Sequence, residues 1–199
     1  MKNIDKKIVW EGNYLRTVIL NYKDASGKDR KWEAVERVNC NGIVVIIPVT
    51  RQGEFLMIRQ FRPVLNNFVI EFPAGLNDKN EDLIEAARRE LVEETGYTSD
   101  DFVPLAEGPI SSGMSTEILT LFLARDAVPA GSRLIQRYSP DETESIEIIK
   151  IPVSEIYETI ETFRKKGDLI DLKIYGFVEI AKKEFRIQNP SDKIVSPES

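Results

Sequence analysis

The sequence predicts a mixed α/β sandwich, because strand-like segments occur both before and after one central amphipathic helix. Runs rich in valine and isoleucine stand on both sides of residues 82–95, whose apolar positions recur with a helical period. The segments do not alternate regularly between strand and helix, as a parallel βαβ fold would require. The length of 199 residues suits one domain, or one domain with a small appendage.

The first predicted element is a β-hairpin over residues 14–38. Two alternating segments flank residues 24–29, and their sequence DASGKD has the composition of a turn. We expect residues 1–40 to form an N-terminal β extension and residues 41–187 to form the main domain. The last residues, 188–199, are rich in proline and serine, and we expect a disordered tail there.

The main domain is predicted to begin with a buried strand. Residues 41–49, NGIVVIIPV, are continuously apolar, as is typical of a central strand covered on both faces. The turn TRQGE leads into residues 55–62, which we expect to pair with this strand as a hairpin. Residues 68–75 form a further short strand, and the helix over 82–95 ends at Gly96, a C-terminal stop.

The second half of the chain supplies the remaining strands and two more helices. An apolar strand over residues 117–124 follows a strand and a Gly/Ser loop. The acidic loop 139–144 then leads into a strand over 145–153. We expect an amphipathic helix over 154–167, capped by Ser154, and a last helix over 171–185.

Residue content excludes several kinds of chemistry. The chain is 42% hydrophobic and 30% charged, as is usual for a soluble protein with a core, and it contains no histidine and one cysteine. A Ser-His-Asp triad, a Cys-His pair, a histidine zinc site and an intrachain disulfide are therefore excluded. Acid–base chemistry must rest on carboxylates, lysine, tyrosine or a metal-bound water.

Charge and hydropathy bound the partners and the location. The net charge is −6, and the sequence has no basic block that would serve as a nucleic-acid footprint. The apolar runs are shorter than the roughly 20 residues that a membrane helix needs. The first residues lack the apolar segment of a secretory signal. We therefore expect a cytoplasmic protein that binds neither nucleic acid nor membrane.

The central helix places two carboxylates toward the core. At about 100° per residue, Glu90 and Glu94 fall on or beside the apolar stripe that contains Leu91, whereas Arg89 falls on the far side. Burying two carboxylates costs several kcal/mol unless a positive charge compensates. Carboxylates one turn apart can share Mg²⁺ or Mn²⁺, and Glu93 can contribute at the edge. The alternative is a surface helix stabilised by ion pairs.

Residues 75–97 carry a spaced motif: Gly75, Glu81, Arg89-Glu90-Leu91, Glu93-Glu94 and Gly96-Tyr97. At every fixed position it resembles the signature of the Nudix hydrolases, which split nucleoside diphosphates linked to another group. The resemblance implies an α/β/α sandwich with a mixed sheet. It also implies that metal is held by the carbonyl of Ala74 and by Glu90, Glu94 and Glu93. Arg89 would hold Glu93 by an ion pair, and Gly75 would let the strand turn into the loop.

Three further segments, RKWEAVER, IRQFRPVLNNFVIEFPAGL and TESIEII, are similar to the ADP-ribose pyrophosphatase branch of that family. The likeness implies an N-terminal hairpin swapped between the subunits of a homodimer. It implies that Glu144, or alternatively Glu142, acts near the attacking water. The residues that it implies for substrate binding are Trp32 and Tyr14 stacking on adenine, Glu33 on the adenine amino group, Arg37 and Arg62 on the phosphates, and Gly113 and Met114 in the substrate loop.

Two departures concern the part of the pocket that selects the substrate. Ser112 replaces a proline of the branch, and PVLNN replaces a segment that contains glycine. We expect a metal-dependent hydrolysis of ADP-ribose to AMP and ribose 5-phosphate. One alternative is another nucleoside diphosphate sugar, such as GDP-mannose. Another is a non-catalytic Nudix domain that senses ADP-ribose.

Overall fold

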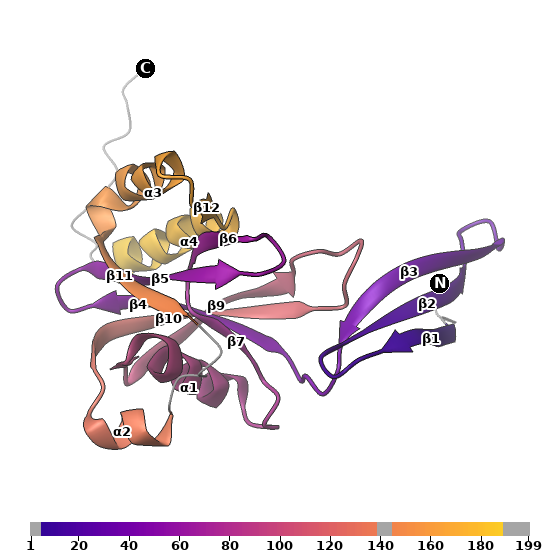
Figure 1. Cartoon of the computed structure of the whole chain (residues 1–199), viewed down its shortest axis with the longest axis horizontal. Coiled ribbons are helices and arrows are strands. Elements are labelled where there is room, and N and C mark those ends of the chain that lie inside the picture. The colour runs from indigo at the N-terminus through magenta and orange to yellow at the C-terminus, as the bar shows by residue number, and fades with distance from the viewer. Residues whose placement is uncertain (1–4, 139–144, 189–199) are drawn as a thin grey trace.

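Two β-sheets of unequal size build the protein, and Figure 1 shows that the smaller one projects from the main body. The computed structural model describes residues 5–138 and 145–188, with side chains as far as Glu184. Nearly all of the tail expected over 188–199 therefore lies outside the described residues. The first sheet, here called the N-terminal sheet, is antiparallel and contains β1 (Asp5–Glu11), β2 (Leu15–Lys23) and β3 (Asp29–Arg37).

The N-terminal sheet contains the predicted hairpin, as β2 and β3, and one strand that the sequence did not predict. β1 is exposed along its whole length, and its apolar residues Ile8, Val9 and Trp10 are consecutive, so it lacks the apolar alternation by which a strand is recognised. Glu36 joins the three strands: its carboxylate accepts from Lys6 Nζ at 3.0 Å and from Arg16 Nε at 2.8 Å. Only 8% of Glu36 is exposed, so this network is the polar centre of the sheet.

The larger sheet is mixed and forms the main body. Its central order is β12-β6-β5-β4-β10-β8, and β7, β9 and β11 pair with β4, β10 and β5. Its strands are β4 (Ile43–Thr50), β5 (Glu54–Arg62), β6 (Asn67–Glu71), β7 (Ala74–Leu76), β8 (Tyr97–Thr98), β9 (Asp101–Pro109), β10 (Ile118–Pro129), β11 (Ile146–Pro152) and β12 (Leu169–Ile170).

The prediction of a hairpin over residues 43–62 is correct only next to the turn and wrong for the rest of the two strands. β4 and β5 pair only at Val49 and Phe55, after which they diverge. β4 instead runs parallel to β10 and antiparallel to β7, whereas β5 pairs with β6 and β11. Apolar content correctly predicted that β4 is buried, but periodicity does not identify the partner of a strand.

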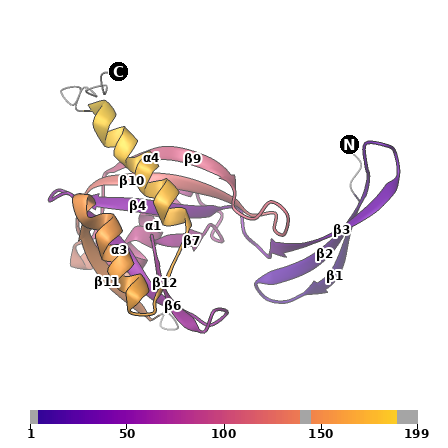
Figure 2. The same ribbon diagram turned by 90° about the horizontal axis from the view of Figure 1, so that it is seen from above.

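Helices cover both faces of the larger sheet, as Figure 1 shows, which confirms the predicted α/β/α sandwich. α1 (Leu83–Thr95) packs on one face through the fully buried Ala87 and Leu91. α3 (Ile156–Lys165) and α4 (Lys173–Gln188) cover the other face, and Figure 2 shows α4 lying across β4 and β10. Each fully buried side chain of leucine size stabilises this packing by about 1.5–3 kcal/mol.

Local details differ from the sequence expectation at two helices. α2 (Ser132–Arg137) was not predicted, and its residues include none that is buried. Ser154 does not cap the helix that follows it, because a 3₁₀ turn over Val153–Glu155 precedes α3, which begins without a side-chain cap. Among the helices of the described residues, none has the length and apolar character that a membrane crossing requires.

Candidate active site

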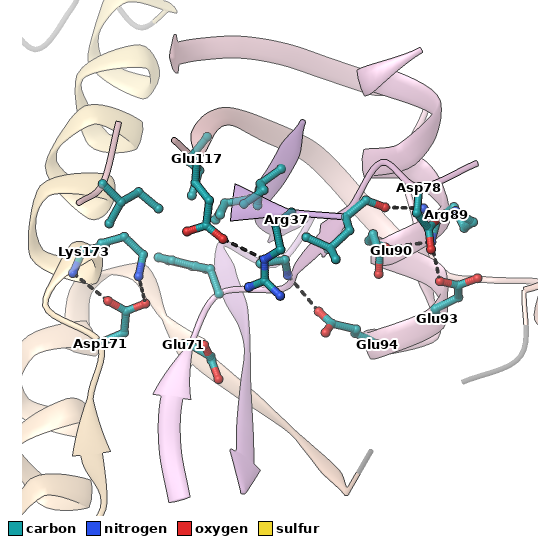
Figure 3. A pocket seen from close by; sticks show the side chains of 18 of the residues that line it. Arg37, Glu71, Asp78, Arg89, Glu90, Glu93, Glu94, Glu117, Asp171 and Lys173 are labelled. Carbon is teal, nitrogen blue, oxygen red and sulfur yellow. Dashed lines mark hydrogen bonds and ion pairs between the residues drawn. The ribbon is translucent and has the colours of Figure 1, made fainter. Parts of the chain in front are cut away.

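A cleft of about 740 Å³ lies where β7, α1, the start of α4 and the N-terminal sheet meet. Figure 3 shows charged side chains of α1, of the start of α4 and of the N-terminal sheet facing it. Eight of the residues predicted for the site line this cleft: Tyr14, Arg37, Arg62, Ala74, Arg89, Glu90, Glu93 and Glu94.

Helix α1 supplies the acidic side of the cleft. It begins after Asp82 and ends at Gly96, whose φ of 66° is the left-handed conformation that glycine adopts at low cost. Within these limits the helical period turns Glu90 and Glu94 inward, beside the buried Leu91. The side chain of Glu90 is 12% exposed, and residue Glu94 is 7% exposed. The two carboxylates therefore lie where the sequence pattern places them.

Gly75 is required by its contact with Glu90. A Cβ atom at Gly75 would lie 1.8 Å from the Glu90 carboxyl carbon and 1.9 Å from Oε1. The φ angle of Gly75 is not positive, so the turn explanation offered by the sequence is wrong. The absent side chain instead leaves a space in β7 that the Glu90 carboxylate fills. Strand and helix thus fix this carboxylate at the cleft wall.

Arg89 holds the acidic groups together from behind. Its guanidinium donates to Glu81 at 2.8 Å, Glu90 at 2.7 Å, Glu93 at 2.8 Å and the Leu76 carbonyl at 3.0 Å. Burial lowers the pKa of Arg89, but the charge of Glu90 and the hydrogen bonds to the glutamates outweigh it, so the pKa lies above its ordinary value. The guanidinium therefore stays charged throughout the working range of pH.

The helical period alone placed Arg89 on the far side of α1, away from the apolar stripe. In the structure Arg89 is only 4% exposed. The end of β7 and the loop before α1 cover that side, where Leu76 supplies its carbonyl and Glu81 its carboxylate as acceptors. A loop that folds back on a helix leaves no periodic signal, so the sequence could not show this burial.

Oxygen atoms that suit a hard cation meet between β7 and α1. Glu94 Oε2 accepts from the Ala74 backbone N–H at 2.9 Å, which brings this carboxylate to the strand that carries the Ala74 carbonyl. Carboxylate and carbonyl oxygens are the ligands that Mg²⁺ and Mn²⁺ prefer. Among the side chains of residues 5–138 and 145–184, no group of three acidic or cysteine residues is placed so that it could hold a metal ion.

Two arginines reach the cleft, each oriented by a glutamate that the sequence reasoning missed. Arg37 Nε donates to Glu117 at 2.7 Å, and Arg62 Nε donates to Glu71 at 2.7 Å. Bonding through Nε fixes the plane of the guanidinium, whose terminal N–H groups suit phosphate oxygens. A signal for Glu71 was present, because it is a single charge within the apolar strand FVIEF.

Four of the residues predicted to bind substrate do not line the cleft of the single chain. Trp32 Nε1 donates to the Gly113 carbonyl at 2.9 Å, and the Val35 N–H donates to the Met114 carbonyl at 2.8 Å. β3 thus packs against the loop that precedes β10. Glu33 follows Trp32 on the strand, so its side chain points to the opposite face of the sheet. Trp32 and Met114 are both exposed.

The acidic loop cannot be placed in this site. Glu144 and Glu142 lie outside the described residues, which resume at Ser145. Ile146, the first residue of β11, lines the cleft. Carboxylates on a helix and arginines on two strands, all facing one cleft of an α/β/α sandwich, define a site suited to metal ions and phosphate groups.

Comparison with known proteins identifies the family. The model of the NUDIX domain family matches residues 41–171, so the chain belongs to the Nudix family. This match confirms the resemblance seen in residues 75–97. An ADP-ribose pyrophosphatase of Bacillus subtilis is 30% identical over 161 residues, which cover 81% of this chain and 83% of the relative. An ADP-sugar pyrophosphatase of Mus musculus is 28% identical over 184 residues, covering 86% and 83%.

The fold is shared with a solved structure. A crystal structure of an ADP compounds hydrolase matches with a TM-score of 0.76 and covers 94% of this chain and 95% of the other. At 20% sequence identity this likeness concerns the fold alone. It extends over the N-terminal sheet as well as the main body, because nearly all of both chains is included.

Proposed function

We propose that this protein is a pyrophosphohydrolase that uses Mg²⁺ or Mn²⁺ to cleave ADP-ribose, with one water, into AMP and ribose 5-phosphate. The observation that carries the proposal is the contact of the Glu90 carboxylate with Gly75, which fixes a helix carboxylate in a cleft that also holds two oriented arginines. The relatives named for ADP-ribose and ADP-sugar cleavage support the substrate class.

The residues around the cleft divide the work. Glu90, Glu94 and the Ala74 carbonyl would hold the metal, with Glu93 at the edge. A metal bound there would neutralise the diphosphate and activate water. Arg37 and Arg62 would bind the phosphate oxygens. Arg89 does not contact substrate in this proposal, because its N–H groups donate to Glu81, Glu90 and Glu93. Its role is to position these glutamates.

For the attack itself we propose Glu144, with Glu142 as the alternative, as the carboxylate that orients or deprotonates the water. Glu93 is the nearest described candidate for the same task. It is held by Arg89 at 2.8 Å and by Lys79 at 3.6 Å, so its carboxylate has a fixed place at the cleft.

The adenosine half would bind at the N-terminal sheet. Tyr14 lines the cleft and offers an aromatic face, and we propose that Trp32, Glu33, Gly113 and Met114 complete this site in a homodimer whose N-terminal sheets are exchanged. The exposed apolar side chains of this sheet support the dimer; they include Ile8, Val9, Trp10 and Leu15. Light scattering on the eluting peak of a sizing column should report twice the 22.7 kDa chain mass.

The test of activity is a substrate panel. ADP-ribose, GDP-mannose, NADH and diadenosine polyphosphates are each incubated with Mg²⁺ and with EDTA, and the products are separated by chromatography. We expect fast cleavage of ADP-ribose that EDTA abolishes. Faster cleavage of another nucleotide sugar would change the proposed substrate but not the proposed reaction type. Binding of ADP-ribose without cleavage of any compound would contradict the proposed enzyme and favour a non-catalytic sensor of ADP-ribose. The proposed location is the cytoplasm.

A further inference from the structure

The start of α4 brings a lysine and an aspartate to the cleft, and neither belongs to the motifs of the sequence. Asp171 and Lys173 both line the cleft, together with Ile174 one residue further on. In the view of Figure 3 the two charged side chains lie on the other side of Arg37 from Glu90 and Glu94.

Asp171 is fixed by the helix that follows it. Its Oδ1 accepts from the Lys173 backbone N–H at 3.0 Å, and its carbonyl accepts from the Ile174 N–H at 3.0 Å. The Lys173 ammonium forms an ion pair with Asp171 Oδ2. The side chains of Asp171 and Lys173 are 17% and 33% exposed, so both can be reached by a ligand in the cleft.

This pair differs from the Arg37–Glu117 ion pair of the cleft. Arg37 and Glu117 are 80 residues apart, and they tie two separate parts of the fold together. Lys173 and Asp171 belong to a single turn, so their pairing contributes no such cross-link. The Asp171 carboxylate also accepts from the Lys173 backbone N–H at the start of α4, and this hydrogen bond holds the pair at the cleft surface, where a ligand can reach it.

The chemistry of the pair fits sugar hydroxyl groups. A carboxylate accepts hydrogen bonds and an ammonium donates up to three, while each hydroxyl of a sugar both donates and accepts. The pair has no net charge and no aromatic face, so it suits a polyol better than a phosphate or a base. An aromatic surface for the base is present instead at Tyr14, beside the N-terminal sheet.

We propose that Asp171 and Lys173 bind the hydroxyl groups of the sugar in the non-nucleotide half of the substrate. The inference rests on the proposed function, since it needs a substrate with such a half. Loss of a hydrogen bond from a charged group corresponds to roughly a tenfold loss of affinity or more. Lys173→Met and Asp171→Asn should therefore weaken binding of this half, with little change in kcat.

The experiment measures the two products as separate ligands. Calorimetry in the presence of Mg²⁺ gives Kd for ribose 5-phosphate, AMP and inorganic phosphate with the wild type, with Lys173→Met and with Lys183→Met. Lys183 is exposed on α4 outside the cleft and serves as the matched control. We expect Lys173→Met to raise Kd for ribose 5-phosphate about tenfold, and Kd for AMP and phosphate by less than twofold. Melting curves confirm that each variant is folded.

The other outcomes overturn the inference in distinct ways. A rise for AMP alone would place the pair at the nucleotide half. A parallel rise for inorganic phosphate would make Lys173 a phosphate ligand. Unchanged Kd values for all three ligands would show that the pair does not bind the substrate. Because these titrations need no turnover, they are read even if the substrate panel fails, whereas a wild type that cleaves no nucleotide sugar contradicts the proposed function by itself.

Discussion

Replacing Gly75 by alanine should disable the site while leaving the fold intact. The new Cβ would lie 1.8 Å from the Glu90 carboxyl carbon, where ordinary contact begins at 3.4 Å, so the carboxylate has to move by about 1.6 Å. The end of a flexible side chain can move this far without unfolding the helix. A displacement of about 1 Å in a catalytic group can cost about a hundredfold in rate, which is about 2.7 kcal/mol.

The measurements are kcat/KM for ADP-ribose across a Mg²⁺ titration, and the melting temperature. We expect kcat/KM of Gly75→Ala to fall at least about a hundredfold and the Mg²⁺ requirement to rise. Gly176→Ala is the matched control: Gly176 is exposed on α4, and a Cβ there meets no atom within 4 Å. This control should keep its activity and gain about 0.5–1 kcal/mol of stability.

The reasoning would be refuted by a folded Gly75→Ala protein with wild-type turnover and Mg²⁺ dependence. Such a result would mean that Glu90 reaches the metal from another rotamer, or that it is not a ligand. A second variant separates these cases. Glu90→Asp shortens the side chain, so in the Gly75→Ala background it should relieve the contact, and the two substitutions should be far from additive.

The remaining predictions concern other parts of the site and sheet. Glu94→Gln should lower kcat by at least about a hundredfold with an unchanged melting temperature, because the amide oxygen can still accept from Ala74 while the charge is lost. Trp32→Ala should raise KM for ADP-ribose roughly tenfold and leave kcat alone, and an effect on kcat only would contradict stacking. Glu36→Gln should cost about 1–2 kcal/mol of unfolding free energy, measured with urea. Although burial raises the pKa of Glu36, its two cations bring it below the ordinary value, so this stability is present above about pH 4.3 and lost as pH falls further.

The sequence was most informative for features that depend on helical periodicity within one segment of the chain. Helix α1, its end at Gly96 and the inward placement of Glu90 and Glu94 follow from counting about 100° per residue along one segment. The same segment carries the family motif, so fold, family and acidic site were all predictable. These properties depend on residues that are near one another in the chain.

Properties set by distant segments were not predictable. Glu117 lies 80 residues from Arg37, and no local pattern links the two. The burial of Arg89 depends on a loop that folds back over α1, and the partners of β4 depend on β10, which follows some 70 residues later. β1 carries its apolar residues in one run, Ile8–Trp10, without the alternation that marks a half-buried strand. Each of these features depends on contacts between separate segments of the chain, and a single sequence has no local pattern that reports such contacts.

The charge of the cleft explains why its proposed reaction needs a metal. Among the described residues that line it, seven are acidic and only five are basic, so the cleft is negative before any ligand enters. The diphosphate of a nucleotide sugar is also negative, and the basic groups Arg37 and Arg89 are already bound to carboxylates. Substrate binding would therefore be repulsive unless divalent cations bridge the glutamates and the phosphates. The arginines alone cannot neutralise both, which makes the metal a condition for binding as well as for hydrolysis.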